Sequence, residues 1–350
     1  MDISKASDQT STPNHSPVTA VLGGGSFGTV LANIVASNGY PCRLWLRDEQ
    51  EAREIQASRV NRKYLPEFDL HPSLLVTADL EEATTGADVV MIAVPSSSVR
   101  DLARTVAGRL PPNAVLISGT KGMEPETGFL MSQVINEELP GHRMGVLSGP
   151  NLAKEIAEGH LTGSVIASAD PEVCATAQGL MASENFRIYS NSDVMGVELA
   201  GVLKNIYAIL SGISAGRGSG ANTVSMMMTR GLAEMCRFAA ARGADPRTFL
   251  GLAGVGDLIA TCSSTLSRNY QVGLKVGQGL SLEEAISAVG QTAEGVNTVR
   301  VVAADAKRLN VDMPLAFGLH EILFNQRTLD ELVSSLMNRE QKEDVDYSIV

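Results

Sequence analysis

Short apolar runs and longer mixed segments alternate along the first half of the chain. The apolar runs have the length of strands and lie at residues 18–22, 42–46, 87–94, 114–118 and 144–147. A charged helical segment from about Asp48 to Ser58 separates two of them. The serines after Pro95 are expected to cap another helix, which runs to about Gly108. Apolar runs without alternation are typical of strands that are covered on both faces, as in a parallel sheet.

Two further apolar runs, at residues 164–168 and 186–189, extend this series. Repeated strand–helix–strand units predict an α/β fold with a Rossmann-type, doubly wound parallel sheet. Ligands of such sheets bind at the carboxyl ends of the strands, where the connecting turns gather. We therefore expect the functional residues of this half in the turns that follow the strands.

The pattern changes near Asn191. From Met195 onward the apolar positions follow helical periods, at residues 194–214, 225–242, 269–277, 282–289, 296–309 and beyond Pro314. The segment 194–214 is apolar nearly all round, which indicates a helix buried in a domain core or at a domain junction. We predict a flexible tail at residues 1–17, a Rossmann domain at 18–193, an all-helical domain at 194–340 and a C-terminal tail at 341–350. The cleft between the two domains is the expected active site.

The first strand runs into a glycine turn, Gly23-Gly24-Gly25-Ser26-Phe27-Gly28, which contains the motif G-x-G-x-x-G. Gly23 permits a tight turn, Gly25 has no Cβ to block phosphate oxygens, and Gly28 lets the next helix pack close to the strand. The first N–H groups of that helix carry the positive end of its dipole. Glycines also cluster in ordinary turns, but the strand before and the helix after this motif favour binding of a dinucleotide's pyrophosphate.

Composition and charge exclude several other classes of function. A formal net charge of −11 over 350 residues argues against non-specific nucleic-acid binding, which needs a basic surface. The four cysteines and five histidines are scattered, so we expect reduced, buried thiols and no metal site. Residues 1–17 lack the apolar core of a signal peptide, and we expect no membrane-spanning segment. These features together predict a cytoplasmic protein.

Two lysines are candidates for chemistry. Lys121 lies in a glycine-flanked turn just after a strand, where it either faces a ligand or is simply solvated. Lys204 lies beside Asn205 inside the apolar segment 194–214. A charge there must be paired, neutralised or carried to the surface by the flexible stem of the side chain. Both lysines therefore have a functional and a purely structural interpretation.

Two polar loops are further candidates. The turn Ser148-Gly149-Pro150-Asn151 precedes a helix, so its amides either hold an anion or only cap that helix. The glycine-rich stretch 251–257 ends in the carboxylate of Asp257, and the triplet Ser267-Arg268-Asn269 presents a guanidinium at a helix start. A flexible loop and an ordinary N-cap would account for the same residues.

Taken together, these motifs resemble those of the soluble bacterial NAD(P)-dependent glycerol-3-phosphate dehydrogenases. The resemblance covers roughly residues 18–335 and extends to the stretches Asn61-Arg62-Lys63-Tyr64-Leu65-Pro66, Val94-Pro95-Ser96, Thr120-Lys121-Gly122, Leu152-Ala153-Lys154-Glu155, Leu203-Lys204-Asn205 and Ala293-Glu294-Gly295. The family often has Trp at the position of Phe27, and many members have Ser or Thr at the position of Asn151.

The resemblance implies the reversible reduction of dihydroxyacetone phosphate to sn-glycerol 3-phosphate, a precursor of membrane phospholipids, with NADP or NAD as cofactor. It implies Lys204 and Asp257 as catalytic residues. Cofactor contacts are expected at Gly23, Gly25, Ser26, Phe27, Gly28, Arg47, Lys121, Ala153, Arg268, Thr292 and Glu294. Substrate contacts are expected at Lys121, Gly149, Asn151, Lys204, Asp257, Ser267, Arg268 and Asn269. The resemblance is compatible with a homodimer.

Cofactor choice depends on the residues that follow the second strand. Arg47 comes directly after that strand and Asp48 comes next. An acidic residue at this place binds the ribose 2′-hydroxyl of NAD, whereas an arginine accommodates the 2′-phosphate of NADP. We predict that NADPH is used at least as well as NADH.

Two other functions are compatible with a Rossmann domain followed by a helical domain. A 3-hydroxyacid or 6-phosphogluconate dehydrogenase would also combine a Rossmann domain with helices and a catalytic lysine, and a redox sensor would bind the cofactor without catalysis. The stretch 254–257 and the triplet 267–269 favour the glycerol-3-phosphate dehydrogenase over the other enzymes. A non-catalytic sensor has no need for Lys204 and Asp257 together.

Overall fold

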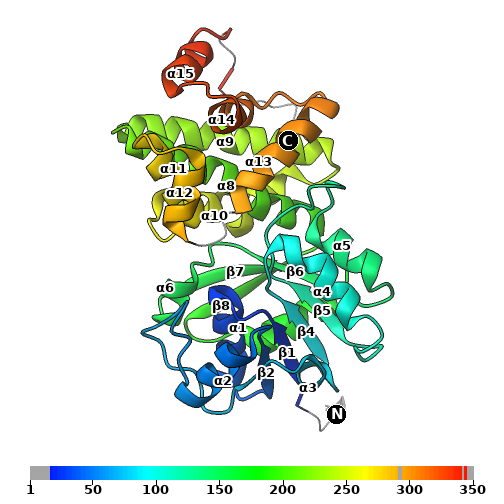
Figure 1. Cartoon of the computed structure of the whole chain (residues 1–350). Coiled ribbons are helices and arrows are strands. Elements are labelled where there is room, and N and C mark those ends of the chain that lie inside the picture. Colours follow the sequence, from blue (N-terminus) through cyan, green and yellow to red (C-terminus); the bar gives the residue numbers. More distant parts are fainter. Residues whose placement is uncertain (1–15, 291–293, 341–342, 345–350) are drawn as a thin grey trace, which may run out of the picture.

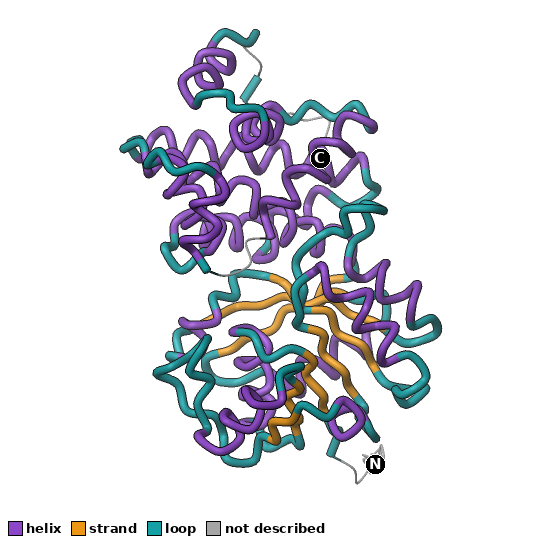
Figure 2. Tube along the Cα trace, viewed as in Figure 1, coloured by secondary structure: helices purple, strands orange, loops and turns teal. Residues whose placement is uncertain are grey.

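The computed structural model describes residues 16–290, 294–340 and 343–344, which form a sheet domain and a helical domain (Figure 1, Figure 2). Helices of the second domain lie against β6 and β7 of the sheet. The predicted combination of an α/β domain and an all-helical domain is confirmed. The expected tails fall mainly on residues 1–15, 341–342 and 345–350, which lie outside the described residues.

Eight strands form one sheet in the order β3-β2-β1-β4-β5-β6-β7-β8. Their bounds are β1 Thr19–Leu22, β2 Cys42–Trp45, β3 Leu75–Thr77, β4 Val89–Ile92, β5 Val115–Ser118, β6 Met144–Ser148, β7 Thr162–Ala167 and β8 Phe186–Asn191. The chain order reverses between β1 and β4, and ligands of doubly wound sheets bind at such a switch point. The short strand β3 was not predicted, because an apolar run of that length does not stand out from a loop.

One strand pairing corrects the expectation of a parallel sheet. β6 and β7 are antiparallel, whereas β7 and β8 are parallel to each other. The connection between β6 and β7 contains only the five-residue helix α6 (Ala153–Ala157). Such a helix is about 8 Å long, whereas a strand of the length of β7 spans about 20 Å. Because α6 is too short to carry the chain back along the sheet, β7 runs in the reverse direction.

Alternate residues of the central strands face two different layers of helices. In β4, Met91 packs in the layer of α1 and α7, whereas Ile92 packs in the layer of α4 and α5. Helices of this domain are α1 (Ser26–Ser37), α2 (Glu49–Ser58), α3 (Leu80–Thr84), α4 (Val99–Val106), α5 (Met131–Glu138) and α7 (Pro171–Met181). Strands that are covered on both faces explain the continuous apolar runs in the sequence.

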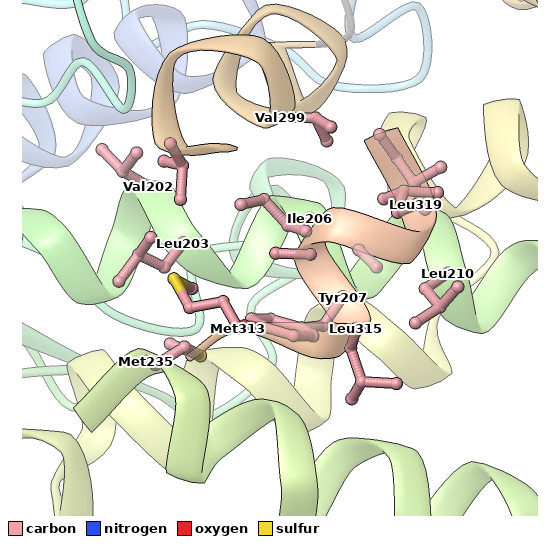
Figure 3. Packing of buried hydrophobic residues seen from close by; sticks show 14 of the residues in the cluster. Val202, Leu203, Ile206, Tyr207, Leu210, Met235, Val299, Met313, Leu315 and Leu319 are labelled. Atoms are coloured by element: carbon pink, nitrogen blue, oxygen red, sulfur yellow. The ribbon is translucent and has the colours of Figure 1, made fainter. Parts of the chain in front are cut away.

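The centre of the helical domain is α8 (Val194–Gly216), whose side chains pack against α9, α13 and α14 (Figure 3). The other helices of this domain are α9 (Ala221–Ala241), α10 (Asp257–Ser263), α11 (Arg268–Gly277), α12 (Leu282–Val289), α13 (Glu294–Arg308), α14 (Pro314–Phe324) and α15 (Leu329–Met337). Within the described part of the chain, α8 is the one helix long and apolar enough to cross a membrane, and most of it is buried inside the protein. It is the predicted core helix.

Three local expectations need correction. The serines after Pro95 do not cap the next helix, because the side chain of the N-cap residue Ser98 makes no capping hydrogen bond. The helix predicted from residue 225 already begins at Ala221. Among the thiols, Cys236 is half-buried, whereas the other three are buried as expected, and all four are free.

Candidate active site

The glycine turn joins β1 to α1 at the switch point of the sheet. Gly23 has a φ of +126°, and a Cβ at this position would lie 2.5 Å from the carbonyl oxygen of Ala93, just beyond β4. A Cβ on Gly28 would lie 2.0 Å from the carbonyl oxygen of Gly23. At Gly25 a Cβ would meet no atom within 4 Å, so there is open space at this position. These are the requirements of a turn that a pyrophosphate approaches closely.

Three further residues expected to contact the cofactor lie around this turn. Phe27 lies against Gly119 at the end of β5, where a Cβ would be 3.1 Å from its ring. Arg47 is exposed directly after β2. Ala153 is the half-buried first residue of α6. The glycine turn and these residues fit a dinucleotide that lies along the carboxyl ends of the strands.

Asp48, which follows β2 where an acidic residue can bind the ribose 2′-hydroxyl of NAD, is the N-cap of α2. Its carboxylate accepts a hydrogen bond of 2.8 Å from the backbone N–H of Glu51 and so caps the N-terminus of α2. A carboxylate engaged in this way stabilises the helix through its dipole.

Lys121 connects the two domains. It follows β5, and its Nζ donates to the carbonyl oxygen of Gly149 at 3.0 Å and to Oδ2 of Asp257 at 2.7 Å. Gly149 belongs to the turn after β6, and Asp257 begins α10 of the helical domain. The two loops that sequence analysis singled out separately therefore meet at this lysine.

Lys204 meets the same carboxylate from the other side. Its Nζ donates to Oδ1 of Asp257 at 2.5 Å and to Oγ1 of Thr261 at 2.7 Å. Lys204 is only 6% exposed and Asp257 only 1%, which rules out a side chain that reaches the surface. An ammonium has three N–H groups, and these two bonds leave one for a substrate oxygen. Thr261, which sequence analysis missed, is one helical turn after Asp257 and carries no motif.

Burial and the neighbouring charges shift the pKa of Lys204 in opposite directions. Burial lowers the pKa of Lys204 from its ordinary value to about 7, the charge of Asp257 acts against that decrease, and the charge of Lys121 adds to it. A lysine with a pKa near neutrality can both donate and accept a proton at physiological pH. Lys204 therefore combines burial with a pKa near neutrality, at a place where Lys121 and the turn after β6 meet.

Close packing of α11 against α8 brings the triplet 267–269 to the same place. A Cβ on Gly273 would lie 2.0 Å from the carbonyl oxygen of Ile209, and one on Gly277 would lie 2.4 Å from that of Ile213. This register, continued back by one turn, aligns Asn269 with Asn205, and a Cβ on Gly295 would lie within 3 Å of both residues. Oδ1 of Asn269 accepts a hydrogen bond of 2.9 Å from the N–H of Gly295.

The N-terminus of α11 begins at a buried serine and an exposed arginine. Its N-cap residue Ser267 is buried and accepts a hydrogen bond of 3.2 Å from the N–H of Tyr270. Arg268, the first residue of this helix, is exposed, and it adds a positive charge to the positive end of the helix dipole. An acidic protein that binds an anionic substrate needs such a local concentration of positive charge.

The turn after β6 contains buried polar atoms without a hydrogen-bond partner among the described residues. Asn151 donates from Nδ2 to Oγ of Ser164 at 3.0 Å, whereas its Oδ1 is unpartnered. The hydroxyl of Ser148 is also buried and unpartnered. Buried polar groups in this condition are uncommon and call for a partner such as a ligand or water.

A second hydrogen-bonded contact joins the two domains at another place. Glu294, the first residue of α13, accepts hydrogen bonds from the N–H of Ser96 at 3.1 Å and from the Ser96 hydroxyl. Ser96 lies just after β4, so the contact joins the helical domain to the switch point of the sheet. The expected cofactor residue Thr292 lies outside the described residues.

Comparisons with known proteins agree with this geometry. Two family models match the chain, the N-terminal region of NAD-dependent glycerol-3-phosphate dehydrogenase at residues 18–174 and its C-terminal region at residues 193–334. The chain is 53% identical to glycerol-3-phosphate dehydrogenase [NAD(P)+] of Saccharophagus degradans, with 93% of this chain and 91% of that protein covered. It is 52% identical to the protein of the same name from Pseudomonas fluorescens, with 94% and 96% covered.

Solved structures lead to the same group of proteins. The crystal structure of glycerol-3-phosphate dehydrogenase from Coxiella burnetii matches with a TM-score of 0.89 and 36% identity, covering 93% of this chain and 100% of that one. The glycerol-3-phosphate dehydrogenase of Saccharomyces cerevisiae matches with a TM-score of 0.81 and 27% identity, covering 91% and 99%. The similarity therefore extends over both domains.

Proposed function

The chain belongs to the NAD-dependent glycerol-3-phosphate dehydrogenase family, and from this premise we propose how its residues carry out the reaction. It is an oxidoreductase that interconverts dihydroxyacetone phosphate and sn-glycerol 3-phosphate with NAD(H) or NADP(H). The observation that carries the assignment of roles is the buried Lys204, held by Asp257 at the mouth of the dinucleotide site.

Lys204 is the proton donor and acceptor. The bound nicotinamide supplies or receives the hydride at C2 of the substrate. As the C2 carbonyl oxygen gains negative charge during reduction, the Lys204 ammonium donates a proton to it, and in oxidation the neutral amine removes the hydroxyl proton. Asp257 and Thr261 orient the amine, and Lys121 contributes a second positive charge toward the developing alkoxide.

Arg268 holds the substrate phosphate. A planar guanidinium makes two parallel hydrogen bonds to phosphate oxygens, and the start of α11 adds its dipole and the side chains of Ser267 and Asn269. Gly149 and Asn151 line the opposite side of the substrate, where the unpartnered Oδ1 of Asn151 is an acceptor for a substrate hydroxyl.

The cofactor lies along the glycine turn. Gly23, Gly25, Ser26 and Gly28 receive the pyrophosphate, as their backbone conformation supports. The remaining cofactor contacts come from Phe27, Arg47, Lys121, Ala153, Arg268, Thr292 and Glu294. Since Glu294 bonds to Ser96 across the cleft, it also helps to close the site around the cofactor.

NADPH is used at least as well as NADH. Arg47 is exposed after β2, and the neighbouring Asp48 is occupied as a helix cap. Arg47→Ala should lower the NADPH/NADH ratio of kcat/KM about tenfold, since a charge-assisted hydrogen bond contributes about 1.5 kcal/mol or more. Arg53→Ala, on the exposed side of α2, is the control and should leave the ratio unchanged.

Four further assignments complete the proposal. The boundary between the domains lies at residues 193 and 194, where α8 begins after its cap Asp193. The protein acts in the cytoplasm and supplies glycerophospholipid synthesis, and it works as a homodimer.

The reaction is tested by following NADPH absorbance with dihydroxyacetone phosphate. Reduction of this substrate, together with poor turnover of dihydroxyacetone without its phosphate, supports the proposal. Turnover of 3-hydroxyacids or 6-phosphogluconate in place of glycerol 3-phosphate would refute it.

A further inference from the structure

Asn61 is a fully buried polar residue outside the motifs that bind substrate. It lies in the segment between α2 and β3, and its side chain is 0% exposed. Its Nδ2 donates to the carbonyl oxygen of Gly24 at 2.9 Å and to Oγ1 of Thr29 at 2.9 Å. A residue far from the glycine turn in sequence therefore holds that turn directly.

The carbonyl of Gly24 is the centre of this arrangement. It also accepts a hydrogen bond of 3.3 Å from the Thr29 hydroxyl. The peptide has little room to adjust on its other side, because a Cβ on Gly24 would lie 2.2 Å from Cγ of Leu46. The direction of the Gly24 carbonyl is thus determined by Asn61, Thr29 and the packing against Leu46.

That direction sets the orientation of a group in the turn itself. The Gly24 carbonyl and the Gly25 N–H belong to one planar trans peptide, in which the two point in opposite directions. With the carbonyl held toward Asn61, the Gly25 N–H points away from Asn61. No atom lies within 4 Å of a Cβ built on Gly25, so there is room for a ligand at this residue.

Only one orientation of the Asn61 amide fits. Nδ2 faces two acceptors, and an exchanged amide would place Oδ1 against the Gly24 carbonyl oxygen. In the observed orientation Oδ1 is buried with no hydrogen-bond partner among the described residues. An unpartnered buried acceptor lowers stability, so this side chain holds the turn at a cost to the fold.

We propose that Asn61 is a positioning residue for the cofactor, which presets the Gly24–Gly25 peptide to receive the pyrophosphate. The inference rests on the proposed function, in which this turn binds NAD(P). Asn61 acts through the backbone of Gly24 and does not touch the cofactor. The stretch 61–66, which the sequence analysis singled out without a role, is thereby connected to cofactor binding.

The chain offers a matched control in Asn33. It lies on α1 one turn after Thr29, is 9% exposed, and its Oδ1 accepts a hydrogen bond of 2.6 Å from the N–H of His71. Asn33 therefore ties the same connecting segment to the same helix without touching the glycine turn. Loss of its hydrogen bond loosens the segment but leaves the Gly24 carbonyl in place.

The test compares Asn61→Ala with Asn33→Ala in the full-length protein. Kd for NADPH is measured by fluorescence titration, together with kcat, KM for dihydroxyacetone phosphate and Tm. Asn61→Ala should raise Kd for NADPH about tenfold, as expected for one lost hydrogen bond to a preset dipole. At saturating NADPH its kcat and KM for dihydroxyacetone phosphate should stay near the wild-type values. Asn33→Ala should lower Tm with Kd for NADPH unchanged.

An unchanged Kd in Asn61→Ala would overturn the inference, and so would an equal rise in both variants, which would reflect loosening of the segment alone. If Asn61→Ala does not fold, Thr29→Val removes the second hydrogen bond to Gly24 and should raise Kd by a smaller factor; no change there would also overturn it. Failure of the wild-type protein to bind NADPH would refute the proposed function instead.

Discussion

Two carboxylates of the helical domain are equally buried and differ in their partners. Asp257 and Glu234 are each 1% exposed. Asp257 accepts hydrogen bonds from two lysines, Lys121 and Lys204, and lies at the junction with the sheet. Glu234, on α9, accepts a hydrogen bond of 3.0 Å from the hydroxyl of Tyr207, one turn after Lys204 on α8.

Glu234 has a structural role, because it stabilises the N-terminus of α14. Its carboxylate accepts from the N–H groups of Leu315 at 2.7 Å and Ala316 at 3.1 Å, at the start of α14. Burial raises the pKa of Glu234 to about 7, against the effect of these hydrogen bonds. Carboxylates at helix N-termini are a common means of satisfying the first N–H groups of a helix.

Lys204 and Glu234 thus both titrate near neutrality because both are buried. A perturbed pKa marks a candidate site, but structural groups are perturbed by the same cause. The difference lies in position, since Lys204 faces the carboxyl ends of the strands whereas Glu234 lies among helices. The following predictions test this distinction.

The largest effect is expected from Lys204→Ala. Loss of the proton-transfer group should lower kcat roughly 10²–10⁴-fold, the usual contribution of a positioned acid or base. Kd for NADPH, measured by fluorescence titration, should stay near the wild-type value. Lost cofactor binding or a lost fold would mean that Lys204 is structural like Glu234, and an unchanged kcat would remove it from the mechanism.

Arg268→Lys should have the next largest effect. A lysine cannot reproduce the two parallel hydrogen bonds of a guanidinium to phosphate. KM for dihydroxyacetone phosphate should rise roughly ten- to a hundredfold, as expected for a lost charge-assisted hydrogen bond. Steady-state kinetics at saturating NADPH measure this, and Arg53→Lys, the same exchange on the exposed side of α2, is the control. Near-normal kinetics would move the phosphate site toward Lys121.

Tyr207→Phe tests whether Glu234 is structural. It removes the hydroxyl that Glu234 accepts from and should lower the free energy of unfolding by about 1–2 kcal/mol. Denaturant unfolding measures this change, and kcat should stay near the wild-type value. A large loss of kcat without loss of stability would place Tyr207 and Glu234 in the reaction and break the distinction.

The last prediction concerns the direction of a pH shift. Because burial lowers the pKa of Lys204 to about 7, kcat/KM for glycerol 3-phosphate oxidation should rise as pH increases through this value, and kcat/KM for reduction should fall. Asp257→Asn removes a charge that raises the pKa of Lys204, so both transitions should move to lower pH. Lys121→Met removes a charge that lowers it, so they should move to higher pH. Shifts in the same direction in both variants would contradict this account.

Local patterns were enough to predict much of the fold and part of the site. The glycine turn was predictable because a strand, a turn and a helix follow one another within a few residues, and each has its own local signature. Lys204 was recognisable as a lysine in a helix that is apolar nearly all round. The direction of β7 was not predictable, because an apolar strand has the same pattern whichever way it runs, and only the short connection through α6 decides it.

The spacing of glycines in two helices could have predicted how these helices pack at the site. Glycines recur four residues apart in α8, at Gly212 and Gly216, and in α11, at Gly273 and Gly277. In the structure they allow the two helices to approach so closely that Cβ atoms would meet the partner's backbone. That contact sets the register that aligns Asn269 with Asn205, and a search for paired glycine spacings could have found it.

The sequence by itself determined which segments are strands and helices in most of the chain, where a dinucleotide turn forms, and which residues could do acid–base or phosphate chemistry. These properties depend on residue type and on spacing within a few positions. Only the tertiary structure decided that Asp257 joins Lys121 to Lys204, that Asp48 caps a helix, and that Asn61 holds Gly24. Such contacts join residues from different elements, and burial and charge act through distances in space, which spacing along the chain does not encode.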